Sequence, residues 1–346
     1  MIRKNKYFII LTAIIAIIIA GGKNIETTPG SQGKTVHLLF YNTENLFDTI
    51  DSNLDDDEFV PLSDRRWNTY KYYRKINNIF KVIALCSSDM ITPDIIGLCE
   101  VENINVLDDL CNKTMLSREG YDYIISGGKD LRGINTALLF KKDRYDLLSA
   151  DSWCPVYRDG KYMDTRAVLY TSFRTGDDTL DIIICHWPSR RGGANESEYR
   201  RKKVASYIKR KIDSIGTERK TVIMGDFNDE PGSESVRVTL GAAAENEMKN
   251  HNILVNTSFI PTKGMGTYKY QGSWYLFDQV IVSGSIYGSQ RGLYYKKGSF
   301  RIVNDDALLT ADNTFKGLRP YSTWWGYKYT GGFSDHLPVI ISLATR

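Results

Sequence analysis

Polar residues suited to phosphate chemistry stand at the ends of predicted strands along most of the chain. Each predicted strand is a short apolar run, and the polar residues that border these runs are Asn42, Glu100, His186, Asp226, Asn228, Asp278, Asp335 and His336. Strand ends and the loops after them are where α/β folds place binding and catalytic side chains. One carboxylate in such a position carries no information, but this set includes two of the four histidines and predicts one shared site.

The residue types fit the hydrolysis of a phosphate ester by an activated water. Carboxylate and amide oxygens are the ligands that Mg²⁺ prefers, and an aspartate or histidine can orient or deprotonate water. Arg132, Arg166 and Arg190 are weaker candidates for phosphate contacts, because a solvated salt bridge explains each of them slightly better. The chain has no serine nucleophile elbow, no HExxH and no Walker motif, so rival hydrolase and nucleotide chemistries lack support.

Each candidate also has a purely structural interpretation. An asparagine or aspartate after a strand can close a turn, and an Asp-His pair before a strand can form a surface turn. A single residue fits both interpretations, whereas the whole set fits the structural one poorly. Glu44 and Glu102 are weaker members of the set, and we expect Glu102 to be exposed.

Two amphipathic helices are predicted. One spans about residues 68–86, where apolar residues recur at helical spacing. The other spans residues 195–215, with Asn195 as its N-cap and Tyr199 in its buried stripe. The basic residues at 200–211 fit a solvated helix face better than a surface for binding a polyanion.

Short apolar runs separated by turn signals predict many strands. They fall at residues 36–41, 94–99, 121–125, 135–140, 145–150, 167–173, 180–187, 221–224, 277–282 and 337–343. Helices interspersed with strands, some of them in hairpin-like succession, predict a mixed α/β sandwich.

Seven segments together resemble the endonuclease/exonuclease/phosphatase family, whose members are similar to deoxyribonuclease I. They are FYNTENLF (40–47), GLCEVEN (97–103), RGINTALLF (132–140), ICHWPSR (184–190), IMGDFNDEP (223–231), LFDQVIVS (276–283) and FSDHLPV (333–339). They stand in the order of the family and cover essentially residues 36–345. The resemblance implies a four-layer α/β/β/α sandwich in which helices flank two mostly antiparallel mixed sheets.

The resemblance also implies a metal site that binds Mg²⁺ or Mn²⁺. Glu100 matches the glutamate that ligates the metal in this family, and Asn42 matches the first-strand asparagine that helps to form the metal site. Asp335 matches a residue that lies near the metal in some members.

The remaining candidates match the family's catalytic residues. Asp226 matches the aspartate that orients the attacking water, and Asn228 matches its phosphate-binding neighbour. His336 matches the catalytic histidine, Asp278 the carboxylate that holds it, and His186 a second histidine that donates to phosphate. The resemblance leaves open whether Asp226, His336 or the metal deprotonates the water.

The chain divides into a leader and one catalytic domain. In residues 1–22, basic residues precede a short apolar run that ends in small residues, which predicts a signal peptide or signal anchor. Residues 23–34 have the composition of a linker, and residues 35–346 form the predicted domain. We therefore expect an extracytoplasmic protein, either periplasmic, secreted or held to the membrane through residues 7–20.

Charge and cysteine content narrow the function only slightly. Removing residues 1–22 takes away three of 45 basic residues and none of 41 acidic ones, so a net charge near +1 remains. This charge permits a nuclease but does not argue for one. None of the five cysteines is in a CxxC pair, which argues against a zinc site, although one disulfide stays open. Cys99 and Cys185 are predicted to be buried.

The expected activity is that of an endonuclease or exonuclease, with nucleic acid as the favoured partner. The alternatives are an esterase acting on a phospholipid or a sugar phosphate, and a catalytically silent binding module. No protein partner can be inferred. Trp324 and Trp325 are expected in the core rather than on a ligand. The acidic run at 51–58 lacks the glycine and the spacing of an EF-hand, so a solvated loop is favoured over a calcium site.

Overall fold

Two mixed β-sheets form the centre of the protein. The computed structural model describes residues 34–52, 54–88, 90–128, 130–157, 159–247, 254–259 and 264–346. The predicted signal segment, and all but the last residue of the predicted linker, lie outside the described residues. Residues Lys34–Arg346 form one compact unit.

The first sheet is built around the N-terminal strand of this unit. β1 pairs with β2 in parallel and with β20 in antiparallel orientation. The strand order is β14 (Leu293–Tyr295), β20 (Val339–Thr345), β1 (Thr35–Leu46), β2 (Ile95–Val101), β4 (Asn135–Lys141) and β3 (Tyr121–Ile125), with β15 (Arg301–Ile302) paired to β20.

The second sheet also has seven strands, and β8 lies at its centre. β8 pairs with β7 in parallel and with β13 in antiparallel orientation. The strand order is β5 (Asp146–Trp153), β6 (Val168–Thr175), β7 (Asp178–His186), β8 (Lys220–Asp226), β13 (Asp278–Ser283), β10 (Leu254–Asn256) and β9 (Ala242–Ala244).

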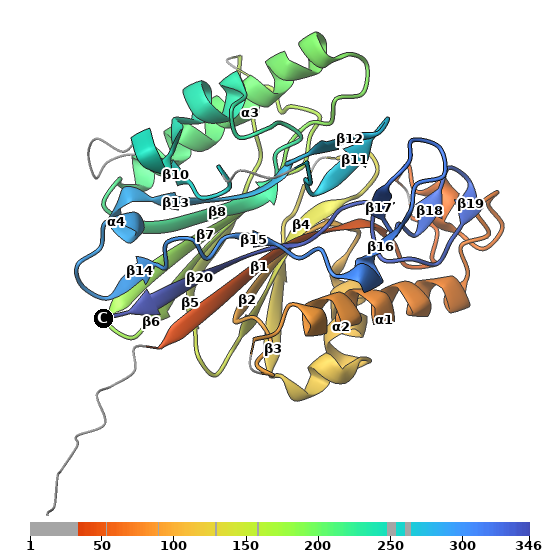
Figure 1. Cartoon of the computed structure of the whole chain (residues 1–346), viewed down its shortest axis with the longest axis horizontal. Coiled ribbons are helices and arrows are strands. Elements are labelled where there is room, and N and C mark those ends of the chain that lie inside the picture. Colours follow the sequence, from red (N-terminus) through yellow and green to blue (C-terminus); the bar gives the residue numbers. More distant parts are fainter. Residues whose placement is uncertain are drawn as a thin grey trace, which may run out of the picture. The chain divides into compact units, whose positions relative to one another are not determined.

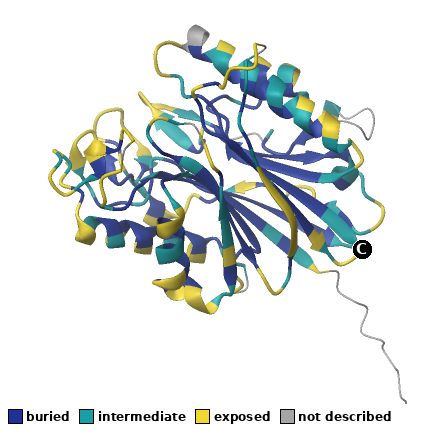
Figure 2. Ribbon diagram, turned by 180° about the vertical axis from the view of Figure 1, so that it is seen from behind, coloured by how far each residue is buried: buried dark blue, intermediate teal, exposed yellow. Residues whose placement is uncertain are grey.

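Helices cover the outer face of each sheet, as Figure 1 shows. Helices α1 (Thr69–Leu85) and α2 (Ile104–Asn112) share a buried apolar cluster with the first sheet. Helix α3 (Ala194–Ile215) and a π-helical turn (Ser235–Leu240) do the same on the second sheet. A third cluster fills the space between the sheets, and Figure 2 shows that the strands of both sheets are mostly buried. The predicted α/β/β/α sandwich is therefore confirmed.

Shorter elements connect these layers. Three two-stranded hairpins are formed by β11 (Tyr268–Tyr270) with β12 (Ser273–Tyr275), β16 (Leu309–Ala311) with β17 (Leu318–Pro320), and β18 (Trp324–Trp325) with β19 (Lys328–Tyr329). The remaining helical segments are α4 (Gly284–Tyr287) and the 3₁₀ turns Asp57–Phe59, Met115–Arg118, Glu245–Glu247 and Asp306–Leu308.

The two predicted helices are present, but α3 differs in detail. It begins at Ala194 with Gly193 at the N-cap, so Asn195 lies inside the helix and the prediction that it caps the helix was wrong. Tyr199 is 57% exposed instead of buried, because it lies outside the helical stripe of Arg201, Val204 and Ile208 that is buried. Among the described residues, no helix is long and apolar enough to cross a membrane.

All five cysteines are described and free, so the disulfide that the sequence left open does not form in this structure. Cys99 and Cys185 are completely buried, as predicted.

Candidate active site

Strand register in the second sheet places three of the predicted site residues side by side. His186 at the end of β7 is opposite Asp226 at the end of β8, and Asp226 is opposite Asp278 at the start of β13. Gly225 makes this packing close, since a Cβ atom there would lie 2.4 Å from the carbonyl oxygen of Cys185. The sequence segments around these residues therefore meet at one end of the sheet.

The first sheet contributes Asn42 and Glu100 to the same end. Asn42 Nδ2 donates a hydrogen bond to Asp226 Oδ2 at 3.1 Å, which joins the two sheets directly. Glu100 has a φ of 61°, in the left-handed region, and lies at a register shift where β2 leaves its partners. Such strained positions are found preferentially at functional sites. Glu100 Oε2 accepts from the backbone N–H of Asn45 at 2.8 Å.

His336 is held by a carboxylate and covered by an aromatic ring. Its Nδ1 lies 2.7 Å from Asp278 Oδ2, and the ring of Tyr268 packs against it with centroids 4.8 Å apart. Burial by itself lowers the pKa of His336, but the carboxylates of Asp278 and Asp226 outweigh it and raise that pKa well above its ordinary value. The geometry therefore favours a protonated imidazolium.

Asp226 Oδ2 is the point on which these elements converge. It lies 3.5 Å from His186 Nε2 and 3.8 Å from His336 Nε2, in addition to its bond with Asn42. Burial raises the pKa of Asp226 to about 7, with His336 opposing the shift. Burial also lowers the pKa of His186 well below its ordinary value, helped by Arg166, and this favours the neutral imidazole.

Asn228 follows Asp226 in a left-handed turn. Its φ is 49°, its N–H donates to Asp226 Oδ1 at 2.9 Å, and its Nδ2 donates to the carbonyl of Trp187 at 3.1 Å. The turn thus holds the Asn228 side chain against the backbone of Trp187 and fixes the second oxygen of Asp226.

The donor set fits a divalent metal. One oxygen or nitrogen from each of Asp226, Asp278 and His336 lies within 4.8 Å of the others, and Asp278 Oδ1 is buried without a hydrogen-bond partner. Because a protonated His336 cannot ligate a cation, the donors open to a metal are carboxylate oxygens. Burial raises the pKa of Asp335, and the Glu100 carboxylate adds to the shift. Several carboxylates collected in one buried place favour a bound cation.

The three candidate arginines take different positions. Arg166 is buried and lies 3.2 Å from Asp130 Oδ2, whereas Arg132 is 3.9 Å from the same carboxyl group and 36% exposed. Arg190 Nη2 pairs with Asp229 at 3.0 Å, and its guanidinium lies over the ring of Phe277. Each arginine therefore forms an ion pair, but only Arg132 and Arg190 keep a substantial exposed surface.

Sequence reasoning missed a buried ion pair behind the site. Lys75 of α1 lies 3.8 Å from Glu44, donates to the Thr323 hydroxyl, and donates to the carbonyl of Phe333 at 2.7 Å. Glu44 accepts from the N–H groups of Thr323 and Trp324. Lys75 occupies a buried position of an amphipathic helix, and that position in the apolar stripe was the signal available in the sequence.

A second missed residue is Arg201 in α3. It is 2% exposed, and its Nε lies 2.7 Å from Asp229, next to the site turn. It shares the helical stripe of Val204, Ala205 and Ile208, so its spacing indicated burial although its charge suggested a solvated face.

Two further expectations about exposure were wrong. Glu102 is 8% exposed, because its carboxylate turns inward to accept from the N–H of Asp48 at 2.6 Å. Trp324 is in the core as expected, but its neighbour Trp325 is 46% exposed because adjacent strand residues point to opposite faces.

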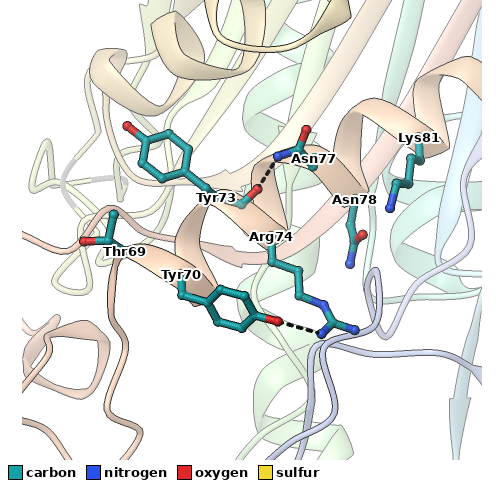
Figure 3. A pocket seen from close by; sticks show the side chains of 7 residues that line it. All are labelled: Thr69, Tyr70, Tyr73, Arg74, Asn77, Asn78 and Lys81. Atoms are coloured by element: carbon teal, nitrogen blue, oxygen red, sulfur yellow. Dashed lines mark hydrogen bonds between the residues drawn. The ribbon is translucent and has the colours of Figure 1, made fainter.

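A separate hollow of about 680 Å³ lies along α1. Figure 3 shows that its lining comes from this helix, with Arg74, Asn77 and Lys81 on its surface. None of the residues predicted for phosphate chemistry lines it, so we place the candidate active site at the strand ends and not here.

Comparison with known proteins agrees with this architecture. The family model described as Endonuclease/Exonuclease/phosphatase family matches residues 37–345. The chain therefore belongs to the endonuclease/exonuclease/phosphatase family, whose members hydrolyse phosphate esters. No curated protein matches the chain.

Solved structures share the fold at low sequence identity. A family protein from Bacteroides thetaiotaomicron is 17% identical with a TM-score of 0.55, and the match covers 91% of this chain and 99% of that one. The human Nocturnin catalytic domain is 15% identical with a TM-score of 0.55, covering 90% and 95%. A Bacteroides thetaiotaomicron mannosyl-6-phosphatase is 17% identical with a TM-score of 0.52, covering 89% and 99%.

Proposed function

We propose that this chain hydrolyses phosphate esters with a water molecule activated at Asp226, and that it requires a divalent metal. The observation that supports this most directly is the convergence on Asp226 Oδ2. Asn42 Nδ2, His186 Nε2 and His336 Nε2 approach this single oxygen at 3.1, 3.5 and 3.8 Å from three different strands or loops. A buried oxygen with this surrounding can orient and deprotonate one water.

In the proposed reaction the water oxygen bonds to phosphorus while the ester P–O bond breaks, and the leaving oxygen takes a proton from solvent to depart as an alcohol. Asp226 takes the proton from the water, which its pKa of about 7 permits near neutral pH. His336, kept protonated by Asp278, donates a hydrogen bond from Nε2 to a phosphoryl oxygen as negative charge develops there. His186, in its neutral form, can donate a further hydrogen bond to the same group.

Glu100, Asn42 and Asp335 are the residues that we propose to hold the metal. Their all-oxygen ligand set suits Mg²⁺ or Mn²⁺. When bound, such a cation neutralises charge on the phosphoryl oxygens.

The test is hydrolysis of bis-p-nitrophenyl phosphate with added Mg²⁺. Asp226→Asn and His336→Asn should each lower the turnover number by roughly 10²–10⁴, the range for a lost acid–base group, and excess chelator should abolish activity. His37→Asn is the matched control, because His37 contacts Ser342 at the first sheet and no residue of the site. A near-wild-type rate in Asp226→Asn, or full activity in chelator, would contradict the proposal.

For the substrate, we propose nucleic acid first. Arg132 and Arg190 border the site with partly exposed side chains, and their guanidinium groups suit phosphates along a strand. A panel of plasmid DNA, single-stranded RNA, sphingomyelin vesicles and sugar phosphates at low salt tests this choice. Nuclease activity should fall as salt rises, because phosphate contacts release counterions.

A sugar phosphate is the second candidate, and the pairing of the basic residues on α3 favours it. Lys202 pairs with Glu198 and Glu234, and Lys209 pairs with Asp213. These ion pairs neutralise part of the basic face and so reduce its attraction for a long polyanion. Intact plasmid and RNA beside a cleaved sugar phosphate would decide for this candidate.

We also propose that residues 1–22 direct export, so that the site works outside the cytoplasm. The support is the basic flank, apolar run and small residues of this segment. A reporter enzyme that is active only after export should be active when it is fused to residues 1–34. A reporter that is active only in the cytoplasm should be inactive when it is fused at the same point. The reverse pattern would reject export.

A further inference from the structure

Besides the active site, one loop gathers carboxylates from a short stretch of chain. Asp51, Asp56 and Asp57 follow β1, and one carboxylate oxygen from each lies within 4.8 Å of the others. We propose that these three residues form a calcium site that is separate from the phosphoesterase centre. A cluster of exposed acids alone would not justify this, and the proposal rests on what surrounds Asp56.

Asp56 is a buried carboxylate with an unused oxygen. The residue is only 3% exposed. Its Oδ2 accepts a long hydrogen bond of 3.3 Å from the N–H of Ser52, while its Oδ1 is shielded from solvent and has no hydrogen-bond partner. Buried charged groups in proteins are normally paired or coordinate a metal. Asp56 therefore needs a cation that the protein itself does not supply.

Among the described residues, the three carboxylates of this loop also have no basic side chain paired with them. In the part of the chain that the structure describes, no lysine, arginine or histidine forms an ion pair with Asp51, Asp56 or Asp57. Glu58, the next acidic residue, behaves differently, since its Oε2 lies 2.8 Å from Arg65 Nε. The protein thus pairs Glu58 with Arg65 and, within the described ranges, leaves Asp51, Asp56 and Asp57 without a partner cation.

The chemistry of the loop selects calcium over magnesium. Ca²⁺ accepts six to eight oxygen ligands in irregular geometry, whereas Mg²⁺ demands near-ideal octahedral geometry and gives up water reluctantly. Asp51 and Asp57 are exposed and leave room for water ligands, and Asp56 adds an anionic oxygen from inside. An irregular loop that ends in a 3₁₀ turn suits the more tolerant ion.

Binding there would stiffen a second loop beside the active site. The N–H of Asp55 donates to the carbonyl of Leu131 at 2.9 Å, directly before Arg132. A cation that fixes residues 51–57 therefore also holds the turn that carries Arg132. The site would be structural, because none of its ligands contacts the residues around Asp226.

The experiment is calorimetric titration of the metal-free full chain with CaCl₂ and, separately, with MgCl₂. Glu100→Gln removes one of the proposed catalytic metal ligands, and any further Ca²⁺ binding that is lost when the loop acids are changed in this variant belongs to the loop. In the Glu100→Gln background we expect Asp56→Asn, and the double change Asp51→Asn with Asp57→Asn, to weaken Ca²⁺ binding at least tenfold. Glu58→Gln is the matched control and should bind Ca²⁺ like its parent.

A thermal scan gives an independent measurement. Ca²⁺ should raise the melting temperature of the Glu100→Gln chain, because a ligand that binds only the folded state stabilises it. The double variant changes two exposed side chains, so it tests the site even if Asp56→Asn fails to fold. The proposal is overturned if the Glu100→Gln chain binds no Ca²⁺, or if the double variant binds it as tightly as Glu58→Gln does.

Discussion

Asp278 sets the charge of the histidine with which it is paired. Its Oδ2 lies 2.7 Å from His336 Nδ1, and both groups are buried. The carboxylate raises the pKa of His336 against the opposing effect of burial. At the scale of single residues, the proposed chemistry depends on this pair and on the lowered pKa of His186. The two histidines are thereby kept in different charge states, with His336 protonated and His186 neutral.

Replacing Asp278 should therefore move the pH dependence of the reaction in one direction. In Asp278→Asn the main group that raises the pKa of His336 is gone, so His336 should lose its proton at lower pH. The alkaline limb of the profile of kcat/KM against pH should then shift to lower pH, and kcat should fall by roughly 10²–10⁴. An alkaline limb that stays in place while kcat falls would show that His336 is not the titrating acid.

At the scale of elements, a buried ion pair connects helix α1 to the segment that carries His336. Lys75 of α1 contacts Thr323, Phe333 and Glu44. Ser334, one residue after Phe333, donates to the carbonyl of Asn42 at 2.7 Å and accepts from the N–H of His336 at 3.1 Å. The helix, the first strand and the segment that carries His336 are thus held in one hydrogen-bonded arrangement.

This arrangement predicts strong coupling between Lys75 and Glu44. Lys75→Met leaves Glu44 buried without its cation and should cost roughly 3–5 kcal/mol of unfolding free energy. Adding Glu44→Gln removes the unpaired charge, so the double variant should be more stable than Lys75→Met alone. Urea denaturation of the four proteins in the double-mutant cycle measures the coupling. Strictly additive losses would show that the two side chains do not interact.

Helix α3 offers a paired comparison between neighbouring arginines. Arg201 is buried against Asp229, whereas Arg200 is 41% exposed and lies 4.0 Å from Asp164. Arg201→Met should cost about 3 kcal/mol, the lower end for a broken buried pair, because Arg190 and the Ser235 hydroxyl also contact Asp229. Arg200→Met should change the unfolding free energy by less than ~1 kcal/mol. Equal losses would contradict the difference in burial.

The elements also show what the sequence could and could not predict. Long periodic segments such as α1 were predictable because an apolar stripe at helical spacing specifies both the helix and its buried face. Strand ends predicted that His186 and Asp226 would lie in one site, but not their register across β7 and β8. The burial of Glu102 depends on Asp48, 54 residues earlier in the chain, and no local pattern contains that contact, whereas the apolar stripe of α1 already includes the position of Lys75.

At the scale of the whole molecule, the candidate site exists only where the two sheets meet. Asn42 belongs to the first sheet and Asp226 to the second, and their hydrogen bond crosses between them. Each sheet has its own outer helical layer and shares the apolar cluster between the sheets. Neither half alone holds the complete set of residues, so a shift of one sheet against the other would separate Asn42 from Asp226.

The pairing of β1 with β20 has a consequence for synthesis of the chain on the ribosome. Thr35 is opposite Ala344, so the first strand of the domain finds its antiparallel neighbour only after β20, the last strand of the domain, has been made. Contacts between such distant residues form slowly, and the exposed edge of a nascent strand can pair with another chain. The growing polypeptide therefore leaves the tunnel with β1 incomplete on one side. Synthesis of β20, rather than of the first half of the domain, should limit the appearance of native protein.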